Sequence, residues 1–162
     1  MIRYPLEYNQ ILNGLRWNTF GWTRTYKDGR PRFHKGWDLQ QPKGTPVYPV
    51  WTGKVFSVQR HDVGKYGKTI NFRFEHNGTV YYAFYGHLSE VWVSAGDIID
   101  TTNVHIGAVG DTGNAKGIAK DAVHLHFEFR SDAYGGNGTS DRVDPVKLLG
   151  DPPYDGIFYI ED

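Results

Sequence analysis

The chain has no cysteine among its 162 residues, which excludes a disulfide scaffold, a thiol nucleophile and a thiolate metal ligand. Any metal site must therefore use histidine, aspartate or glutamate. No stretch approaches the roughly 20 apolar residues that span a bilayer, so we expect no membrane insertion. Net charge is also lacking, because 18 Lys and Arg balance 18 Asp and Glu. This balance argues against a nucleic-acid partner, since such binding depends largely on neutralising phosphates.

Aromatic residues and turn formers, by contrast, are abundant. Aromatics make up 15% of the chain, which also contains 20 glycines and 8 prolines. This composition favours an all-β domain, and the length suits one domain. No segment of a dozen residues has a convincing helical period, so we expect only short helical pieces, near residues 5–15 and 144–149.

The clearest strand signal lies at residues 69–75, where apolar and polar side chains alternate strictly. The core-facing residues of this strand are expected to be Ile70, Phe72 and Phe74. Asn77-Gly78 is a strong hairpin signal, and residues 80–87 are expected to return as the partner strand. Another alternating run covers residues 123–130. We therefore predict antiparallel β-sheets that form a groove.

Two histidines share one face of the run 123–130. Side chains alternate along a strand, which places His124 and His126 on the same face, with Glu128 and Arg130. The opposite face is expected to be core, and it carries Val123, Leu125, Phe127 and Phe129. One metal ion could bind one imidazole while the other reaches the metal's bound water or substrate. Solvent-facing histidine pairs also occur, so this pattern alone does not establish a metal site.

His34 and Asp38 form an H-x-x-x-D element just before a predicted core strand. Imidazole and carboxylate both bind zinc, and Gly36 would let the backbone bend so that the two side chains converge. Such an element by itself is usually not a metal site. His87 ends the returning strand, on the same face as Tyr81, Ala83 and Tyr85. The other three histidines are expected to be ordinary: His61 and His76 in or beside polar turns, and His105 as a half-buried strand residue.

Four segments in a fixed order are much more specific than any one of them. They are His34-x-x-x-Asp38, Tyr85-Gly86-His87-Leu88-Ser89, Gly110-Asp111-Thr112-Gly113-Asn114 and His124-Leu125-His126-Phe127-Glu128. Over residues 31–149 the chain resembles the lysostaphin-type (LytM-like) zinc endopeptidases, which hydrolyse bacterial cell walls. The resemblance implies an antiparallel fold of the duplicated-hybrid-motif type. It leaves unexplained an aromatic N-terminal segment, 1–30, which we expect to pack on the domain, and a C-terminal tail, 150–162.

The same resemblance implies a role for each matching position. His34, Asp38 and His126 correspond to the ligands of Zn²⁺, and His87 and His124 to the catalytic histidines that do not bind the metal. The loop of residues 114–123 is longer than the family commonly has. Because this loop borders the expected groove, it puts the substrate preference in question rather than the zinc site.

The implied function is zinc-dependent hydrolysis of peptidoglycan peptides, either stem cross-links or interpeptide bridges, by a monomer acting in the periplasm or cell wall. No signal peptide is visible, which suits a phage endolysin, a secreted antibacterial effector or a trimmed chain. An effector would imply an immunity protein as partner. Two alternatives remain: a non-catalytic cell-wall-binding or regulatory domain of the same fold, which the five intact positions disfavour, and a zinc amidase, which only product analysis would distinguish.

The N-terminal segment 1–30 holds more aromatic residues than a disordered tail would carry. They are Tyr4, Tyr8, Trp17, Phe20, Trp22 and Tyr26. Packing as a cover over the domain is the default expectation, because burial is the usual fate of aromatic rings. The alternative is that some of these rings, with Tyr85 and the loop 114–123, wall the groove and hold the peptide across the zinc.

Overall fold

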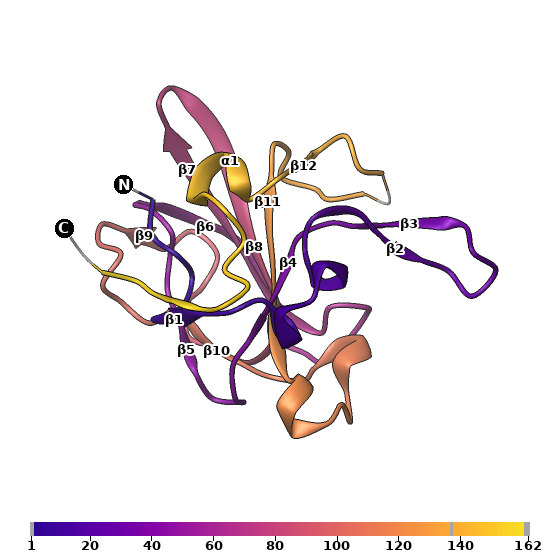
Figure 1. Cartoon of the computed structure of the whole chain (residues 1–162). Coiled ribbons are helices and arrows are strands. Elements are labelled where there is room, and N and C mark those ends of the chain that lie inside the picture. Colours follow the sequence, from indigo (N-terminus) through magenta and orange to yellow (C-terminus); the bar gives the residue numbers. More distant parts are fainter. Residues whose placement is uncertain (1, 137, 161–162) are drawn as a thin grey trace.

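A computed structural model describes residues 2–136 and 138–160. Its main feature is a nine-stranded sheet whose central path runs in the order β12-β11-β8-β7-β6-β9 (Figure 1). The strands of this path are β6 (Gly53–Gln59), β7 (Lys68–His76), β8 (Thr79–Val91), β9 (Ile98–Ile99), β11 (His124–Arg130) and β12 (Arg142–Val143). Off the path, β4 (Trp37–Gln40) pairs with β11, and β10 (Gly107–Val109) pairs with β8 and with β5 (Pro46–Val47). The predicted all-β, antiparallel architecture is confirmed.

Two small sheets flank the main one. β1 (Tyr8–Asn9) pairs with β13 (Ile157–Phe158), which brings the two ends of the chain together. β2 (Gly21–Thr25) pairs with β3 (Pro31–His34), and this hairpin projects from the body of the molecule (Figure 1).

Helix is scarce in the described residues. The one α-helix, α1 (Val146–Leu149), lies within the segment 144–149, where a short helix was predicted. Four 3-10 turns are present: η1 (Leu12–Gly14), η2 (Arg16–Asn18), η3 (Gly113–Ala115) and η4 (Lys120–Ala122). The short helical piece expected near residues 5–15 is present only as the single 3-10 turn η1. β1 occupies part of the stretch before it, and Asn13 and Gly14 have positive φ angles of 56° and 63°, which end the helical geometry. No helix among the described residues is long and apolar enough to cross a membrane.

The core lies where the alternation patterns placed it. Ile70, Phe72, Leu125 and Phe127 are fully buried in one hydrophobic cluster. The hairpin between β7 and β8 turns at Asn77-Gly78, and both residues have positive φ angles, 52° and 78°, as a type I′ turn requires. The polar face of β11 is buried as well, so the candidate site residues lie inside the molecule rather than on an open sheet surface.

The N-terminal residues are part of this core. Ile2, Leu6 and Ile11 are buried in the main cluster, and Ile11 forms an isolated bridge with Leu39 of β4. This packing anchors the chain on both sides of the β2–β3 hairpin, because β3 leads directly into β4.

Candidate active site

Strand pairing brings the two halves of the candidate metal site together. Asp38 of β4 lies opposite His126 of β11, and His34 ends β3 just upstream. One ligand atom from each of the three residues lies within 4.8 Å of the other two, and all three side chains are buried. A Cβ atom on Gly36 would lie only 2.1 Å from the carbonyl oxygen of Phe127. Gly36 lies at a bend between β3 and β4, as the sequence suggested, and it is also needed for a close approach of two backbones.

Hydrogen bonds fix which nitrogen each imidazole presents. Nδ1 of His34 lies 2.8 Å from the carbonyl oxygen of Thr19, to which it donates, and this leaves Nε2 for the site. His126 is reversed: its Nε2 lies 2.6 Å from Oε2 of Glu128, and its Nδ1 faces Oδ1 of Asp38 at 3.0 Å. A second hydrogen bond of this kind orients a metal-binding histidine and sets its tautomer.

The carboxylate of Asp38 is shared between the site and a cation. Its Oδ1 lies 3.3 Å from Nε2 of His34, while its Oδ2 accepts a hydrogen bond from Nη2 of Arg24 at 2.9 Å. Burial opposes ionisation of Asp38, but the neighbouring His34 and His126 outweigh it and hold the pKa of Asp38 well below its usual range. The carboxylate is therefore charged and ready to bind a cation.

Glu128 orients His126 through the hydrogen bond to its Nε2. It is fully buried, and Oε1 accepts hydrogen bonds from Nε of Arg130 at 2.9 Å and Nε of Arg142 at 2.6 Å. Burial alone would raise the pKa of Glu128, but His126 and the two arginines lower it well below its ordinary value. Burial likewise opposes a proton on His126, yet hydrogen bonds to Asp38 and Glu128 raise the pKa of His126.

His87 reaches the site because the strand that carries it is irregular. Strict alternation would place His87 on the core face with Tyr81, Ala83 and Tyr85. Instead, β8 has one more residue than β7 between the pairs Ile70–Tyr85 and Lys68–Leu88, and His87 has a positive φ angle of 60°. This β-bulge turns the ring toward the site.

The two remaining histidines, His87 and His124, are held alike. Nδ1 of His87 donates to the carbonyl oxygen of Thr112, and Nδ1 of His124 to that of Ala122, both at 2.8 Å. The two ring centroids are 5.3 Å apart, and Nε2 of His124 lies 3.8 Å from Oδ1 of Asp38. Burial and the nearby His126 and His124 lower the pKa of His87 to about 4, so that this ring is neutral at pH 7. Because Nδ1 is engaged in both rings, Nε2 is the nitrogen that each ring leaves free.

All five residues of the sequence-based hypothesis are thus gathered at one place, and the other histidines lie outside it. His61 is exposed, and His76 packs against Trp51. His105 is exposed rather than half-buried in a strand, because it lies in the loop before β10. Its Nε2 is 3.0 Å from the hydroxyl of Tyr48.

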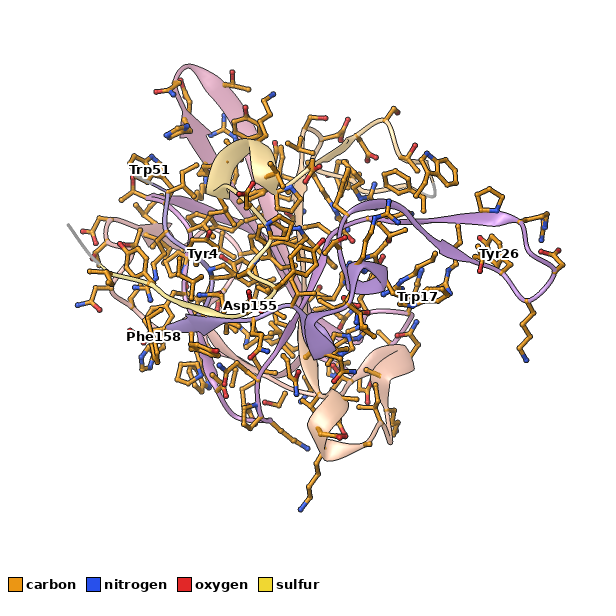
Figure 2. All side chains as sticks on the ribbon, viewed as in Figure 1. Tyr4, Trp17, Tyr26, Trp51, Asp155 and Phe158 are labelled. Atoms are coloured by element: carbon orange, nitrogen blue, oxygen red, sulfur yellow. The ribbon has the colours of Figure 1, made fainter. Side chains whose placement is uncertain are left out.

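A groove of about 700 Å³ opens over these residues. Trp22 and Tyr26 of the projecting hairpin line it and are 63% and 48% exposed. Figure 2 shows Tyr26 near the tip of this hairpin. The loop 114–123 also contributes, through Asn114, Ala115 and Ile118. The N-terminal aromatic residues therefore have two different positions. Trp22 and Tyr26 line the groove, whereas Tyr4 contacts Leu149 and Tyr8 packs against Phe158 of β13.

Tyr85 does not line the groove, and that expectation is wrong. The ring is fully buried on the core face, where it packs against Phe127 at 5.3 Å and donates its hydroxyl to the carbonyl oxygen of Tyr48. The aromatic residue that takes this place is Tyr66, which lines the groove and stacks on His126 with ring centroids 4.9 Å apart.

Sequence reasoning missed three supporting residues: Arg24, Tyr66 and Glu128. Alternation had placed Glu128 on the correct face, so its spacing of two residues from His126 was a usable signal. Arg24 and Tyr66 come from a hairpin and a loop without a motif, and only the folded chain brings them to the site.

The donor set fits zinc. Two imidazole nitrogens and one carboxylate oxygen, with an accessible side facing the groove, are the arrangement of a catalytic rather than a structural zinc site. The residues that would hold the ion are His34, Asp38 and His126.

Comparisons with known proteins agree with this geometry. The chain is 35% identical over 130 residues to the peptidoglycan DD-endopeptidase ShyB of Vibrio cholerae, a match covering 78% of this chain and 26% of that protein. Among solved structures, a zinc-containing peptidase from Vibrio cholerae is 32% identical with a TM-score of 0.61, over 78% of this chain and 35% of that one. The catalytic domain of lysostaphin from Staphylococcus simulans is 27% identical with a TM-score of 0.60, over 83% of this chain and 90% of that one.

The chain spans about a quarter of the length of ShyB and about a fifth of the length of ShyA, a second peptidoglycan DD-endopeptidase of Vibrio cholerae. The profile of peptidase family M23 matches residues 32–145, a range that includes all five residues gathered at the site. The chain therefore belongs to peptidase family M23 and is homologous to peptidoglycan DD-endopeptidases.

Proposed function

We propose that this chain is a zinc-dependent endopeptidase that hydrolyses the peptide cross-links of bacterial peptidoglycan. The observation that carries the proposal is the convergence of His34, Asp38 and His126 beside two further histidines with free Nε2 atoms. A domain that only binds cell wall has no use for this buried set of titratable groups. The relatives named as peptidoglycan DD-endopeptidases support the substrate class.

The ligand residues would present Nε2 of His34, an oxygen of Asp38 and Nδ1 of His126 to the ion. Bound zinc supplies Lewis-acid chemistry for amide hydrolysis at such a site. Thr19 and Glu128 hold the two imidazoles in place, and Arg24 holds the carboxylate. Because these partners lock the side chains, little reorganisation is needed when the ion binds.

His87 and His124 would move the protons. Each ring donates from Nδ1 to a backbone carbonyl, so its Nε2 lone pair can accept a proton from the attacking water. The imidazolium formed in this way can then protonate the leaving amine. The low pKa of His87 keeps it in the accepting form at neutral pH.

The groove gives access for an extended peptide, with Trp22 and Tyr26 on its wall. Such substrates lie in the periplasm or cell wall, and action there is part of this proposal. The proposal is equally compatible with a phage endolysin and with a secreted antibacterial effector. An effector would have an immunity protein as partner, and that protein should bind over the groove.

Mass spectrometry of fragments released from purified sacculi tests the function. An endopeptidase converts cross-linked muropeptide dimers into monomers that keep the sugar–peptide bond. Release of free stem peptides would instead identify an amidase, and no release by the zinc-loaded protein would leave a binding or regulatory domain. His126→Ala is the matched inactive control.

A further inference from the structure

The groove carries a local excess of positive charge. Its lining includes four cationic side chains and a single carboxylate, that of Asp38. The four cations are Arg24, Arg32, Lys35 and Lys65. Arg24 and Asp38 neutralise each other through their ion pair at 2.9 Å, so the uncompensated charge belongs to the other three. The whole chain is neutral, so this excess is a property of the groove and not of the composition.

These three cations have no carboxylate partner among residues 2–136 and 138–160. Lys35 donates from Nζ to the carbonyl oxygen of Gly136 at 3.1 Å, and Lys65 lies over the ring of Tyr66. Arg32 lies 5.6 Å from the ring centroid of Tyr26. Two lysines outside the groove lining, by contrast, are paired: Lys116 with Asp62, and Lys43 with Asp111.

The unpaired cations come from two segments beside the site. Arg32 is on β3, Lys35 follows β3 directly beside the ligand His34, and Lys65 precedes β7 beside Tyr66. Lys35 is half-buried at the edge of the groove. A concave site lined with one sign of charge focuses its potential on a ligand of opposite charge.

On the basis of the proposed function, we propose that Arg32, Lys35 and Lys65 bind free carboxylates of the peptide substrate beside the scissile amide. The substrate is then an anionic cross-linked stem peptide rather than a neutral interpeptide bridge. Guanidinium binds a carboxylate through two parallel hydrogen bonds, whereas ammonium acts as a compact point charge. Trp22 and Tyr26 supply flat contact area for the uncharged parts of the peptide.

Two matched peptides test this inference: one cross-linked muropeptide with free carboxylates, and the same compound with those groups converted to carboxamides. We expect the wild-type zinc enzyme to have a KM about tenfold or more lower for the free acid, with kcat similar for both. Arg32→Gln, Lys35→Gln and Lys65→Gln should each raise KM for the acid roughly two- to five-fold, the range of exposed charge pairs. The triple variant should lose the preference, and Lys54→Gln, an exposed lysine on β6, is the control.

Equal KM values for acid and amide, unchanged in the triple variant, would overturn the inference while leaving the proposed function intact. If neither peptide is cleaved, the proposed function fails. Titration calorimetry of the wild-type protein with the two peptides then still tests whether the three cations bind the carboxylates. Tighter binding of the acid, lost in the triple variant, supports the carboxylate site, and equal binding overturns it. Equal competition by a polyphosphate would also overturn it, because the site would then select charge without carboxylate chemistry.

Discussion

Arg24 holds Asp38: Nη2 of the guanidinium donates to Oδ2 of the carboxylate at 2.9 Å. The same guanidinium contacts Oδ1 of Asn18 at 3.1 Å, and its Nε donates to the carbonyl oxygen of Trp17 at 2.7 Å. With Oδ2 engaged, Oδ1 is the oxygen that faces the two imidazoles. Arg24 lies outside the matched residues 32–145, so a residue of the N-terminal segment completes the candidate centre.

The first prediction concerns this contact. Arg24→Gln should weaken zinc binding by about 10- to 100-fold, the usual effect of removing a residue that orients a metal ligand. The dissociation constant can be measured by competition with a chromogenic chelator, without reference to activity. Arg30→Gln is the control, because Arg30 is on the same hairpin and its pair with Asp28 is exposed. An unchanged zinc affinity in Arg24→Gln would show that Arg24 is not needed to orient the carboxylate of Asp38.

Glu128 is the second test, because its carboxylate is fully buried between two arginines. Glu128→Gln removes the charge that Arg130 and Arg142 compensate, and we expect a loss of about 3–5 kcal/mol in the free energy of unfolding. Asp141→Asn removes the half-buried partner of the same Arg142, which keeps its pair with Glu128, so its cost should be smaller, about 1 kcal/mol. Urea denaturation of the two variants measures the difference, and equal costs would contradict a structural role for the buried carboxylate.

Local patterns predicted the faces of the strands but not the irregularities within them. Alternation over residues 123–130 placed Leu125 in the core and His126 opposite it, because the period of two is a property of the backbone itself. The same rule would have turned His87 into the core. The one-residue bulge that rotates it depends on the register of β7 against β8, which is set by pairing between distant segments.

The supporting contacts show the same limit. Arg24 and Tyr66 reach the site only because the β2–β3 hairpin and the loop before β7 fold over β11. No short-range pattern marks these positions, since their neighbours are ordinary turn and loop residues. The five principal positions, by contrast, were found from motifs whose order along the chain resembles a family.

A third prediction separates the proposed ligands from the proposed proton-transfer groups. His126→Ala should lose bound zinc and keep the fold, whereas His87→Ala and His124→Ala should keep zinc and lower kcat by on the order of 10²-fold or more. Elemental analysis, circular dichroism and turnover on sacculi measure the three properties. Near-normal turnover in both single variants with zinc in place would mean that the roles are wrongly assigned.

Gly36 provides a fourth test, in which the backbone is the target. A Cβ atom at this position would lie 2.1 Å from the carbonyl oxygen of Phe127, so Gly36→Ala must push β11 away from the turn between His34 and Asp38. We expect a loss of about 1–3 kcal/mol in unfolding free energy, the cost of overpacking, together with weaker zinc binding. Gly136→Ala is the control, because the nearest atom to its Cβ would be 4.0 Å away. Wild-type stability in Gly36→Ala would show that the two backbones can separate without cost.

The last prediction concerns the aromatic wall of the groove. Trp22 and Tyr26 are largely exposed, and each ring lines the groove rather than the core. Exposed rings contribute little to folding, so Trp22→Ala and Tyr26→Ala should leave the unfolding free energy nearly unchanged. If the rings hold the peptide equally in the ground and transition states, truncation raises KM more than it lowers kcat. Tyr134→Ala is the control, because Tyr134 is 79% exposed and lies outside the groove lining. A fall in kcat at constant KM would instead place these rings in the chemical step, and no change in either constant would leave the groove wall without a part in binding.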